Sequence, residues 1–298
     1  MNVYPFIAAE KAAAHHVTTA CALLEVSTSA YYQWSRHGPS ARARVDAELG
    51  ERIVRIHCDS RGTYGAPRVH AQLQRDGMCV GARRVARLMR ERGLAGRCRR
   101  RSQRTTIPDP RDPATVDLLQ RHFEAAALGL NQAWCGDITY VRTWEGWLYL
   151  ATVIDIASRR VVGWAMADHM RSTLVADALR MAVESRRPPA GLIFHADRGS
   201  QYTAREFTAQ LRDHAIRQSL SRPRQCWDNA VAESWFATLK DELIYRRSWP
   251  TRAAAQHAIF EFIEVFYNRQ RLHSALGYCS PAEYEAAKVR QPMAAQAA

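Results

Sequence analysis

Residues 134–166 read WCGDITYVRTWEGWLYLATVIDIASRRVVGWAM, and this stretch decides the fold. Three runs rich in β-branched and aromatic residues, 134–143, 147–156 and 160–166, are separated by short breaks. They predict three consecutive strands, and the short connections favour antiparallel pairing. Downstream, helix and strand patterns alternate in the order 174–185 (helix), 192–195 (strand), 204–214 (helix), 216–220 (strand), 229–243 (helix) and 252–269 (helix). This order predicts an α/β layer fold with a mixed sheet.

The chain before this stretch has a helical pattern. Helices predicted at 17–24 and 31–34, with Ser27 or Thr28 as the N-cap of the second, favour a helix-turn-helix, although any helical hairpin gives the same pattern. Another helix is predicted at 45–57. Helices at 66–75 and 82–92 then predict a second helix-turn-helix, and the proline-rich residues 105–113 (TTIPDPRDP) predict a linker.

Positive charge is concentrated in this first part. The 298 residues include 42 Lys and Arg against 29 Asp and Glu, a formal net charge of +13, of which residues 1–110 carry +10 (19 basic, 9 acidic). Residues 83–104 contain ten Arg and a single acid, Glu91. A charge run is often only a solvated face, but a basic tail after a helical hairpin favours contact with a nucleic-acid backbone. The candidate DNA-binding residues are Arg83, Arg84, Arg87, Arg99, Arg100 and Arg101.

Several classes of protein are disfavoured. No apolar run reaches the ~18 residues of a membrane helix, and the N-terminal residues lack a signal-peptide pattern, so we expect a cytoplasmic protein with no membrane partner. Seven cysteines without a CxxC pair argue against a disulfide framework and a zinc site, and favour buried reduced thiols. The absence of paired His and Cys ligands also disfavours a zinc hydrolase.

Three carboxylates are candidate metal ligands. Asp137 lies inside a strand pattern, where Asp is depleted, although an edge or strand end is the alternative. Asp197 follows a predicted strand, where α/β sheets bind ligands, although a turn cap fits equally. Glu233 lies in a predicted helix, and Lys240 follows two helical turns later on the same face. Two-metal phosphoryl transfer needs carboxylates that converge from separate elements.

Four ordered motifs resemble the DDE transposases of bacterial insertion sequences, whose catalytic core is similar to retroviral integrase. The motifs are WCGDITY (134–140), HADRGSQY (195–202), WDNAVAESWF (227–236) and YNRQRLHSALGYCSPAEY (267–284). The 35 residues between Asp197 and Glu233 match the spacing of the family's acidic triad, and Lys240 matches its basic residue. The resemblance covers nearly the whole chain. The chain departs from common family residues at Ala196, Ala204, Trp235 and 223–225.

The resemblance implies an RNase H-like fold, a mixed five-stranded sheet flanked by helices, after an all-α helix-turn-helix region. It places Asp137 on the first strand, Asp197 just after the fourth and Glu233 on a following helix. It implies that these three residues bind two Mg²⁺ ions, which Mn²⁺ could replace, and that Lys240 contacts DNA. The expected domains are 1–38 (helix-turn-helix), 39–104 (second, basic helix-turn-helix), 105–125 (linker), 126–289 (catalytic) and 290–298 (flexible tail).

The implied activity is metal-dependent cleavage at the ends of a mobile element, followed by strand transfer from the resulting 3′-hydroxyl. The implied partners are double-stranded DNA, both inverted repeats and target, further copies of the chain on DNA, and the product of an upstream reading frame as a fusion. Two alternatives are a catalytically inactive DNA-binding regulator and an RNase H-like hydrolase that cleaves without joining.

Three more residues have two interpretations each. Asp155 either caps the turn at 157–158 or takes a direct role in the site, and the turn cap is favoured. His195 precedes Asp197 by two residues and either contacts the site or is packed by hydrogen bonds. The family resemblance assigns the segment of His273 to DNA contact or to bracing the site, and a helix cap ending at Gly277 is the alternative.

Overall fold

The computed structural model describes residues 3–37, 40–97, 128–221 and 229–296. The chain forms two compact units, Met1–Gly96 and Arg97–Ala298. The predicted linker, 105–125, and the departure from the family at 223–225 fall outside the described residues. Within the described part of the chain, no helix is long and apolar enough to span a membrane.

The first three helices of the N-terminal unit are α1 (Tyr4–Ala12), α2 (Val17–Leu23) and α3 (Thr28–His37). They share a small core built from Ile7, Cys21 and Tyr31. The Ser27 hydroxyl accepts a hydrogen bond from the backbone N–H of Ala30 at 3.1 Å, so Ser27 is the N-cap of α3. The helical pair predicted at 17–34 is confirmed, whereas α1 was not predicted.

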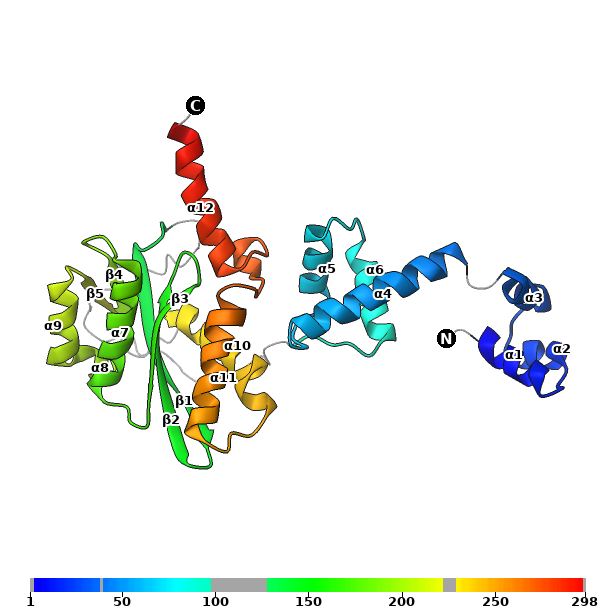
Figure 1. Cartoon of the computed structure of the whole chain (residues 1–298), viewed down its shortest axis with the longest axis horizontal. Coiled ribbons are helices and arrows are strands. Elements are labelled where there is room, and N and C mark those ends of the chain that lie inside the picture. Colours follow the sequence, from blue (N-terminus) through cyan, green and yellow to red (C-terminus); the bar gives the residue numbers. More distant parts are fainter. Residues whose placement is uncertain (1–2, 38–39, 98–127, 222–228, 297–298) are drawn as a thin grey trace, which may run out of the picture. The chain divides into compact units, whose positions relative to one another are not determined.

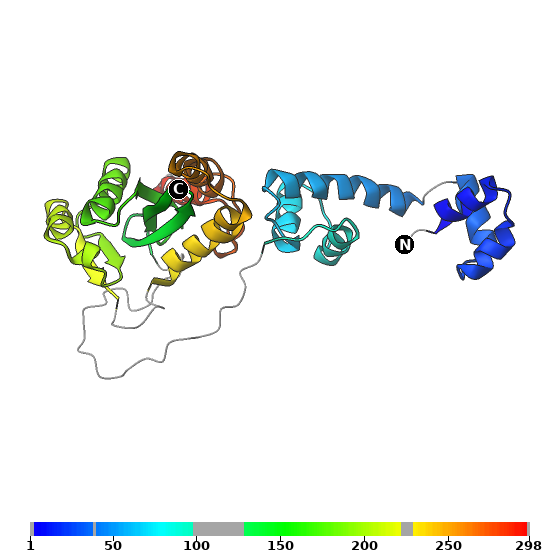
Figure 2. The same ribbon diagram turned by 90° about the horizontal axis from the view of Figure 1, so that it is seen from below.

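Three further helices of this unit pack on one another, α4 (Ala41–Asp59), α5 (Ala66–Arg75) and α6 (Ala82–Glu91) (Figure 2). They bury Leu49 and Ile53 of α4 together with apolar side chains of α5 and α6. Helix α4 begins at residue 41, four residues before the predicted start at residue 45. The cause is its N-cap, Ser40, whose hydroxyl accepts a hydrogen bond from the N–H of Ala43 at 3.1 Å. The two helices predicted at 66–75 and 82–92 are confirmed.

The C-terminal unit contains a mixed sheet of five strands in the order β3-β2-β1-β4-β5 (Figure 1). The strands are β1 (Ala133–Thr143), β2 (Gly146–Asp155), β3 (Val161–Ala167), β4 (Ile193–Ala196) and β5 (Arg217–Leu220). The first three pair antiparallel, while β4 is parallel to β1 and β5 is parallel to β4. This confirms the predicted mixed sheet.

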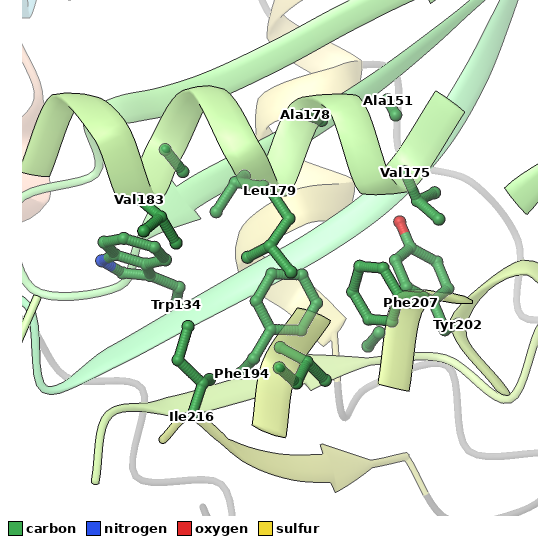
Figure 3. Packing of buried hydrophobic residues seen from close by; sticks show 14 of the residues in the cluster. Trp134, Ala151, Val175, Ala178, Leu179, Val183, Phe194, Tyr202, Phe207 and Ile216 are labelled. Carbon is green, nitrogen blue, oxygen red and sulfur yellow. The ribbon is translucent and has the colours of Figure 1, made fainter. Parts of the chain in front are cut away.

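Helices cover both faces of the sheet. Figure 1 shows α7 (Ser172–Arg186), α8 (Ser200–Thr203) and α9 (Arg205–Asp213) on one side, and α10 (Ala230–Glu242) and α11 (Arg252–Glu261) on the other. The first side buries an apolar core with Trp134, Phe194 and Phe207, seen in Figure 3. A Cβ added at Gly163 would lie 2.2 Å from the carbonyl oxygen of Ala178, so glycine lets α7 pack closely on β3.

Three details differ from the sequence-based predictions. The helix predicted at 252–269 is α11 followed by a π-helical segment, η3 (Phe262–Tyr267), whose aromatic rings pack around Trp235. The residues predicted as a flexible tail, 290–298, include the end of α12 (Pro281–Gln296). All five cysteines in the described residues are free thiols, but Cys58 and Cys79 are exposed rather than buried.

Candidate active site and DNA-contacting residues

The pairing of β1 with β4 brings two of the candidate carboxylates together. Cys135 of β1 lies opposite His195 of β4 in this parallel pair. Asp137 follows Cys135 by two residues and is still on β1, and Asp197 follows His195 by two residues and comes immediately after β4. Because side chains alternate along a strand, Asp137 points to the face opposite Trp134 and the α7 core. The two aspartates therefore leave neighbouring strands at the same edge.

Glu233 joins them from the first turn of α10. This helix packs on β1, and the Asn229 side-chain amide just before it donates to the carbonyl oxygen of Gly136 at 3.1 Å. Ala232 is fully buried, and its backbone N–H faces the thiol of Cys135. Small residues at the start of α10 thus allow the close approach that places Glu233 beside Asp137. The predicted cap Asp228 falls outside the described residues.

The three carboxylates influence one another electrostatically. Burial, with the negative charges of Asp197 and Glu233, raises the pKa of Asp137 to about 7. Two groups lower this pKa: the backbone N–H of Ile138, which lies 2.7 Å from Asp137 Oδ1, and the ammonium group of Lys240. Burial is the largest of these effects, so the cost of ionising Asp137 is mainly the loss of water around its charge. A partly buried set of carboxylate oxygens suits a hard divalent cation.

The carboxylate oxygens are held by local backbone groups. Asp137 Oδ1 accepts from Ile138, and Asp197 Oδ1 accepts from the N–H of Gly199 at 3.0 Å. Within the described ranges, no group of three or more His, Cys, Asp or Glu side chains is arranged to hold a metal ion. The backbone thus brings the three residues to one place, while the oxygens of Asp137 and Asp197 make local contacts.

Lys240 lies where the sequence predicted, two turns after Glu233 on α10. Its Nζ lies 5.7 Å from the centre of the Tyr140 ring. Tyr140 follows Asp137 by three residues on β1, so the ammonium group lies beside the strand that carries the first carboxylate.

His195 and Asp155 have structural partners. The His195 ring is fully buried between the hydroxyls of Ser219 and Ser221, at 2.9 and 3.1 Å from its two nitrogens. Asp155 accepts from the backbone N–H groups of Ser158 at 2.9 Å and Asn131 at 2.8 Å. The packed histidine and the turn-capping aspartate are therefore the interpretations that the structure supports.

Tyr202 was missed by the sequence analysis. Its ring packs against Phe194 and Phe207 (Figure 3), and its buried hydroxyl has no hydrogen-bond partner among the described residues. Burial, with the nearby charges of Asp137 and Asp197, raises its pKa well above the ordinary value. A Cβ at Gly136 would lie 2.5 Å from the Phe194 ring and 3.3 Å from that of Tyr202. Glycine before Asp137 is thus required by packing.

The segment of His273 lies against the helix that carries Glu233. His273 is 9% exposed and meets the Tyr267 ring edge-on, with ring centres 4.8 Å apart. Nearby, the buried guanidinium of Arg271 forms a two-point ion pair with Glu242 of α10, at 2.8 and 2.6 Å. These contacts favour bracing of α10. Gly277, with φ of 65°, ends the short 3-10 helix η4 (Ser274–Leu276), as the capping alternative predicted.

The candidate DNA-binding arginines differ in their surroundings. Arg84 and Arg87 of α6 both pair with Asp46 of α4, and the hydrogen bond from Arg87 lowers the pKa of Asp46. Arg87 also pairs with Glu91 at 2.6 Å. Arg83 is exposed. Residues Arg99, Arg100 and Arg101 lie outside the described residues.

A mixed sheet of this order, with carboxylates on β1, just after β4 and on α10 beyond β5, is typical of an RNase H-like polynucleotidyl transferase of the integrase type. Models described as "Integrase core domain" match residues 129–226 and 214–281, and a model described as "HTH-like domain" matches residues 44–102. The integrase-core and HTH-like modules identify DNA as the molecule on which the chain acts.

Sequence relatives identify the family. The chain is 42% identical over 264 residues to the "Insertion element IS600 uncharacterized 31 kDa protein" of Shigella sonnei, covering 89% of this chain and 96% of the relative. It is 39% identical over 274 residues to "Transposase InsF for insertion sequence IS3A" of Escherichia coli (strain K12), covering 89% and 92%. The chain therefore belongs to the DDE transposases of bacterial insertion sequences, in the family that contains the IS3 transposases.

Solved structures with a similar arrangement come from retroviruses. One chain of the simian T-cell lymphotropic virus intasome gives a TM-score of 0.44 at 15% identity, covering 78% of this chain and 73% of that one. The catalytic core domain of BIV integrase gives 0.40 at 20% identity, covering 54% and 98%.

Proposed function

We propose that Asp137, Asp197 and Glu233 are the catalytic carboxylates of this transposase and hold two Mg²⁺ ions, for which Mn²⁺ can substitute. When bound, the metal would activate the attacking oxygen and stabilise the leaving 3′ oxygen of the DNA strand. The observation that carries the proposal is the convergence of the three carboxylates, which with burial raises the pKa of Asp137 to about 7. Three acids on separate elements, with Lys240 as a nearby cation, form a site that needs divalent cations.

The chain's own residues position the reacting groups. Asn229 fixes the start of α10 on Gly136, which holds Glu233 next to the strand of Asp137. The Arg271–Glu242 pair secures the far end of the same helix. Lys240, on the face of Glu233, contacts a phosphate of the bound DNA and so orients the strand over the carboxylates.

We further propose that residues 1–38 and 39–104 bind the terminal inverted repeats, and that 105–125 link them to a catalytic domain at 126–289. In this proposal Arg83, which is exposed, contacts phosphates, and so do Arg99, Arg100 and Arg101. Arg84 and Arg87 must exchange Asp46 for DNA. The protein acts in the cytoplasm on paired ends as an oligomer, and as a fusion with an upstream product. These assignments rest on the resemblance and on the match of the HTH-like model to residues 44–102.

The test is strand cleavage and joining on a duplex that carries the element's own end, with Mg²⁺. Asp137→Asn and Glu233→Gln should each abolish cleavage, while Asp177→Asn, an exposed carboxylate on α7, should leave it intact. Full activity in either triad variant would overturn the assignment. Binding without cleavage by the unmodified protein would instead identify the inactive regulator, and cleavage without joined product would identify the hydrolase.

A further inference from the structure

A groove lies beside the candidate active site, at the far end of β1. Its volume is about 540 Å³. We call it the aromatic groove and define it by Tyr140, Arg142, Trp144, Lys240, Tyr245 and Arg247. One wall is the end of the β1–β2 hairpin. The other is the segment after α10, which contains the 3-10 helix η2 (Ile244–Arg246).

Backbone contacts fix the two walls to each other. The N–H of Trp144 in the hairpin donates to the carbonyl oxygen of Trp249 at 3.0 Å. The indole N–H of Trp249 donates in turn to the carbonyl oxygen of Ile244 at 3.1 Å, and the Arg247 guanidinium lies 4.5 Å from the centre of its ring. The groove is therefore a built feature of the fold.

Its aromatic rings face water. Trp144 is 76% exposed, Tyr245 71% and Tyr140 56%. Leaving three large rings in solvent at one place is characteristic of a binding surface. Every charged residue that lines the groove, Arg142, Lys240 and Arg247, is basic. The acid in the adjoining turn, Glu145, accepts the backbone N–H of Arg252 at 2.8 Å.

Flat exposed rings among cations form the surface that binds unpaired nucleotides. The bases stack on the rings and the cations follow the phosphates. The bases of a duplex are stacked on one another and cannot offer their faces to Trp144 or Tyr245. A volume of about 540 Å³ is in the range of pockets that enclose one small ligand, so it has room for an unpaired base rather than for a duplex.

We propose that the aromatic groove binds a short unpaired stretch of the DNA strand that leaves the active site. Tyr140 lies three residues beyond Asp137 on the same strand, a distance of about 10 Å, and Lys240 belongs to both places. The location of the unpaired stretch next to the cut rests on the proposed function. Binding of an unpaired strand in the groove does not, because it needs no metal and no carboxylate.

The test uses the full chain with a metal chelator and two probes. One is an oligodeoxythymidylate that carries a single 5-iododeoxyuridine, and the other is a blunt duplex with the same label. Ultraviolet crosslinks from the single strand should map to the peptides of Trp144 or Tyr245, and those from the blunt duplex should not. Trp144→Ala should raise the Kd for the single strand at least about fivefold, the loss of one stacked base, and change the Kd for the duplex less than twofold.

The matched control is Phe260→Ala, which removes a ring that is 45% exposed on α11 outside the groove, and should leave both Kd values unchanged. Equal loss for both probes, crosslinks confined to other segments, or an unchanged single-strand Kd would overturn the inference. A change in oligomeric mass without a change in Kd would identify the groove as a contact between copies and would also overturn it. Asp137→Asn should keep the crosslink even if it abolishes cleavage, so failure of the groove and failure of the proposed triad give different results.

Discussion

Replacing Asp137 with Asn should stabilise the metal-free protein at alkaline pH. The native site raises the pKa of this carboxyl from an ordinary 3.8 to about 7, chiefly by burial. At ~1.4 kcal/mol per pH unit, ionising Asp137 above pH 7 therefore costs the native state up to about 4 kcal/mol. Asn has nearly the same shape and carries no charge, so the variant avoids this cost.

The sign of the pH dependence follows from proton binding. Between pH 4 and 7 the native state holds the Asp137 proton more often than the unfolded chain does, so the stability of the unmodified protein falls as pH rises. By the same linkage, the stability gap in favour of Asp137→Asn should grow by roughly 3 kcal/mol between pH 5 and pH 8.

Denaturant unfolding followed by tryptophan fluorescence measures this gap. Seven of the eight tryptophans lie in the C-terminal unit, and only Trp34 lies in the other, so the signal reports mainly the unit that holds the site. Asp177→Asn, which changes an exposed side chain of α7, serves as the control and should show no such pH dependence. A variant less stable than the unmodified protein at pH 8, or a gap equal at pH 5 and pH 8, would refute the electrostatic reasoning. Added Mg²⁺ should stabilise the unmodified protein more than Asp137→Asn.

Three other substitutions test contacts within the C-terminal unit. Gly163→Ala should lower the free energy of unfolding by about 1–3 kcal/mol, since its Cβ would lie 2.2 Å from a carbonyl of α7, and an unchanged denaturation midpoint would contradict this. Tyr202→Phe should leave that free energy unchanged or raise it, because it removes a buried hydroxyl without a partner, and a loss above ~1 kcal/mol would show that the hydroxyl is bonded. Glu285→Gln should lower the free energy of unfolding by about 3 kcal/mol, because the buried Glu285 carboxylate forms ion pairs with Arg160 at 2.6 Å and Arg186 at 2.8 Å. The exposed pair Asp177–Arg180 should contribute less than ~1 kcal/mol. Burial raises the pKa of Glu285, but the ion pair with Arg186 and the other hydrogen bonds outweigh burial and lower this pKa below 4.5. The stabilisation is therefore present above pH 4.5 and should be lost as the pH falls through the lowered pKa.

The first three strands of the sheet were predictable because their signals are local. Residues 134–166 contain three runs of strand-forming residues with short breaks, and β1, β2 and β3 begin and end within one residue of the predicted bounds. The helix α1 and the end of α12 were not predicted. The first depends on the packing of Ile7 against Cys21 and Tyr31 of the next two helices, and the second runs into the segment predicted as a flexible tail.

The candidate site was likewise predictable only in part. Asp137, Asp197 and Glu233 were identified from spacing and resemblance, and the structure brings their elements together. The partners that hold those elements were not visible in the sequence. Glu242 is separated from Arg271 by 29 residues, and Asp46 is separated from Arg87 by 41. Tyr202 lies within the motif HADRGSQY (195–202), but only the packing under Gly136 shows that its ring supports the strand of Asp137.

The register of β1 with β4 is the feature on which the site depends most. Because side chains alternate, a slip of one residue in this pairing would turn the Asp137 carboxylate into the α7 core and put Gly136 or Ile138 opposite Asp197. Three contacts oppose such a slip. Trp134 is fully buried in the core, Gly136 has no room for a side chain beneath Phe194, and its carbonyl receives Asn229 from α10. The hydrogen bond from Asn229 to Gly136 also fixes the position of α10 along β1, so the same bond positions Glu233. Packing thus maintains a cluster of acids whose mutual repulsion, without metal, favours their separation.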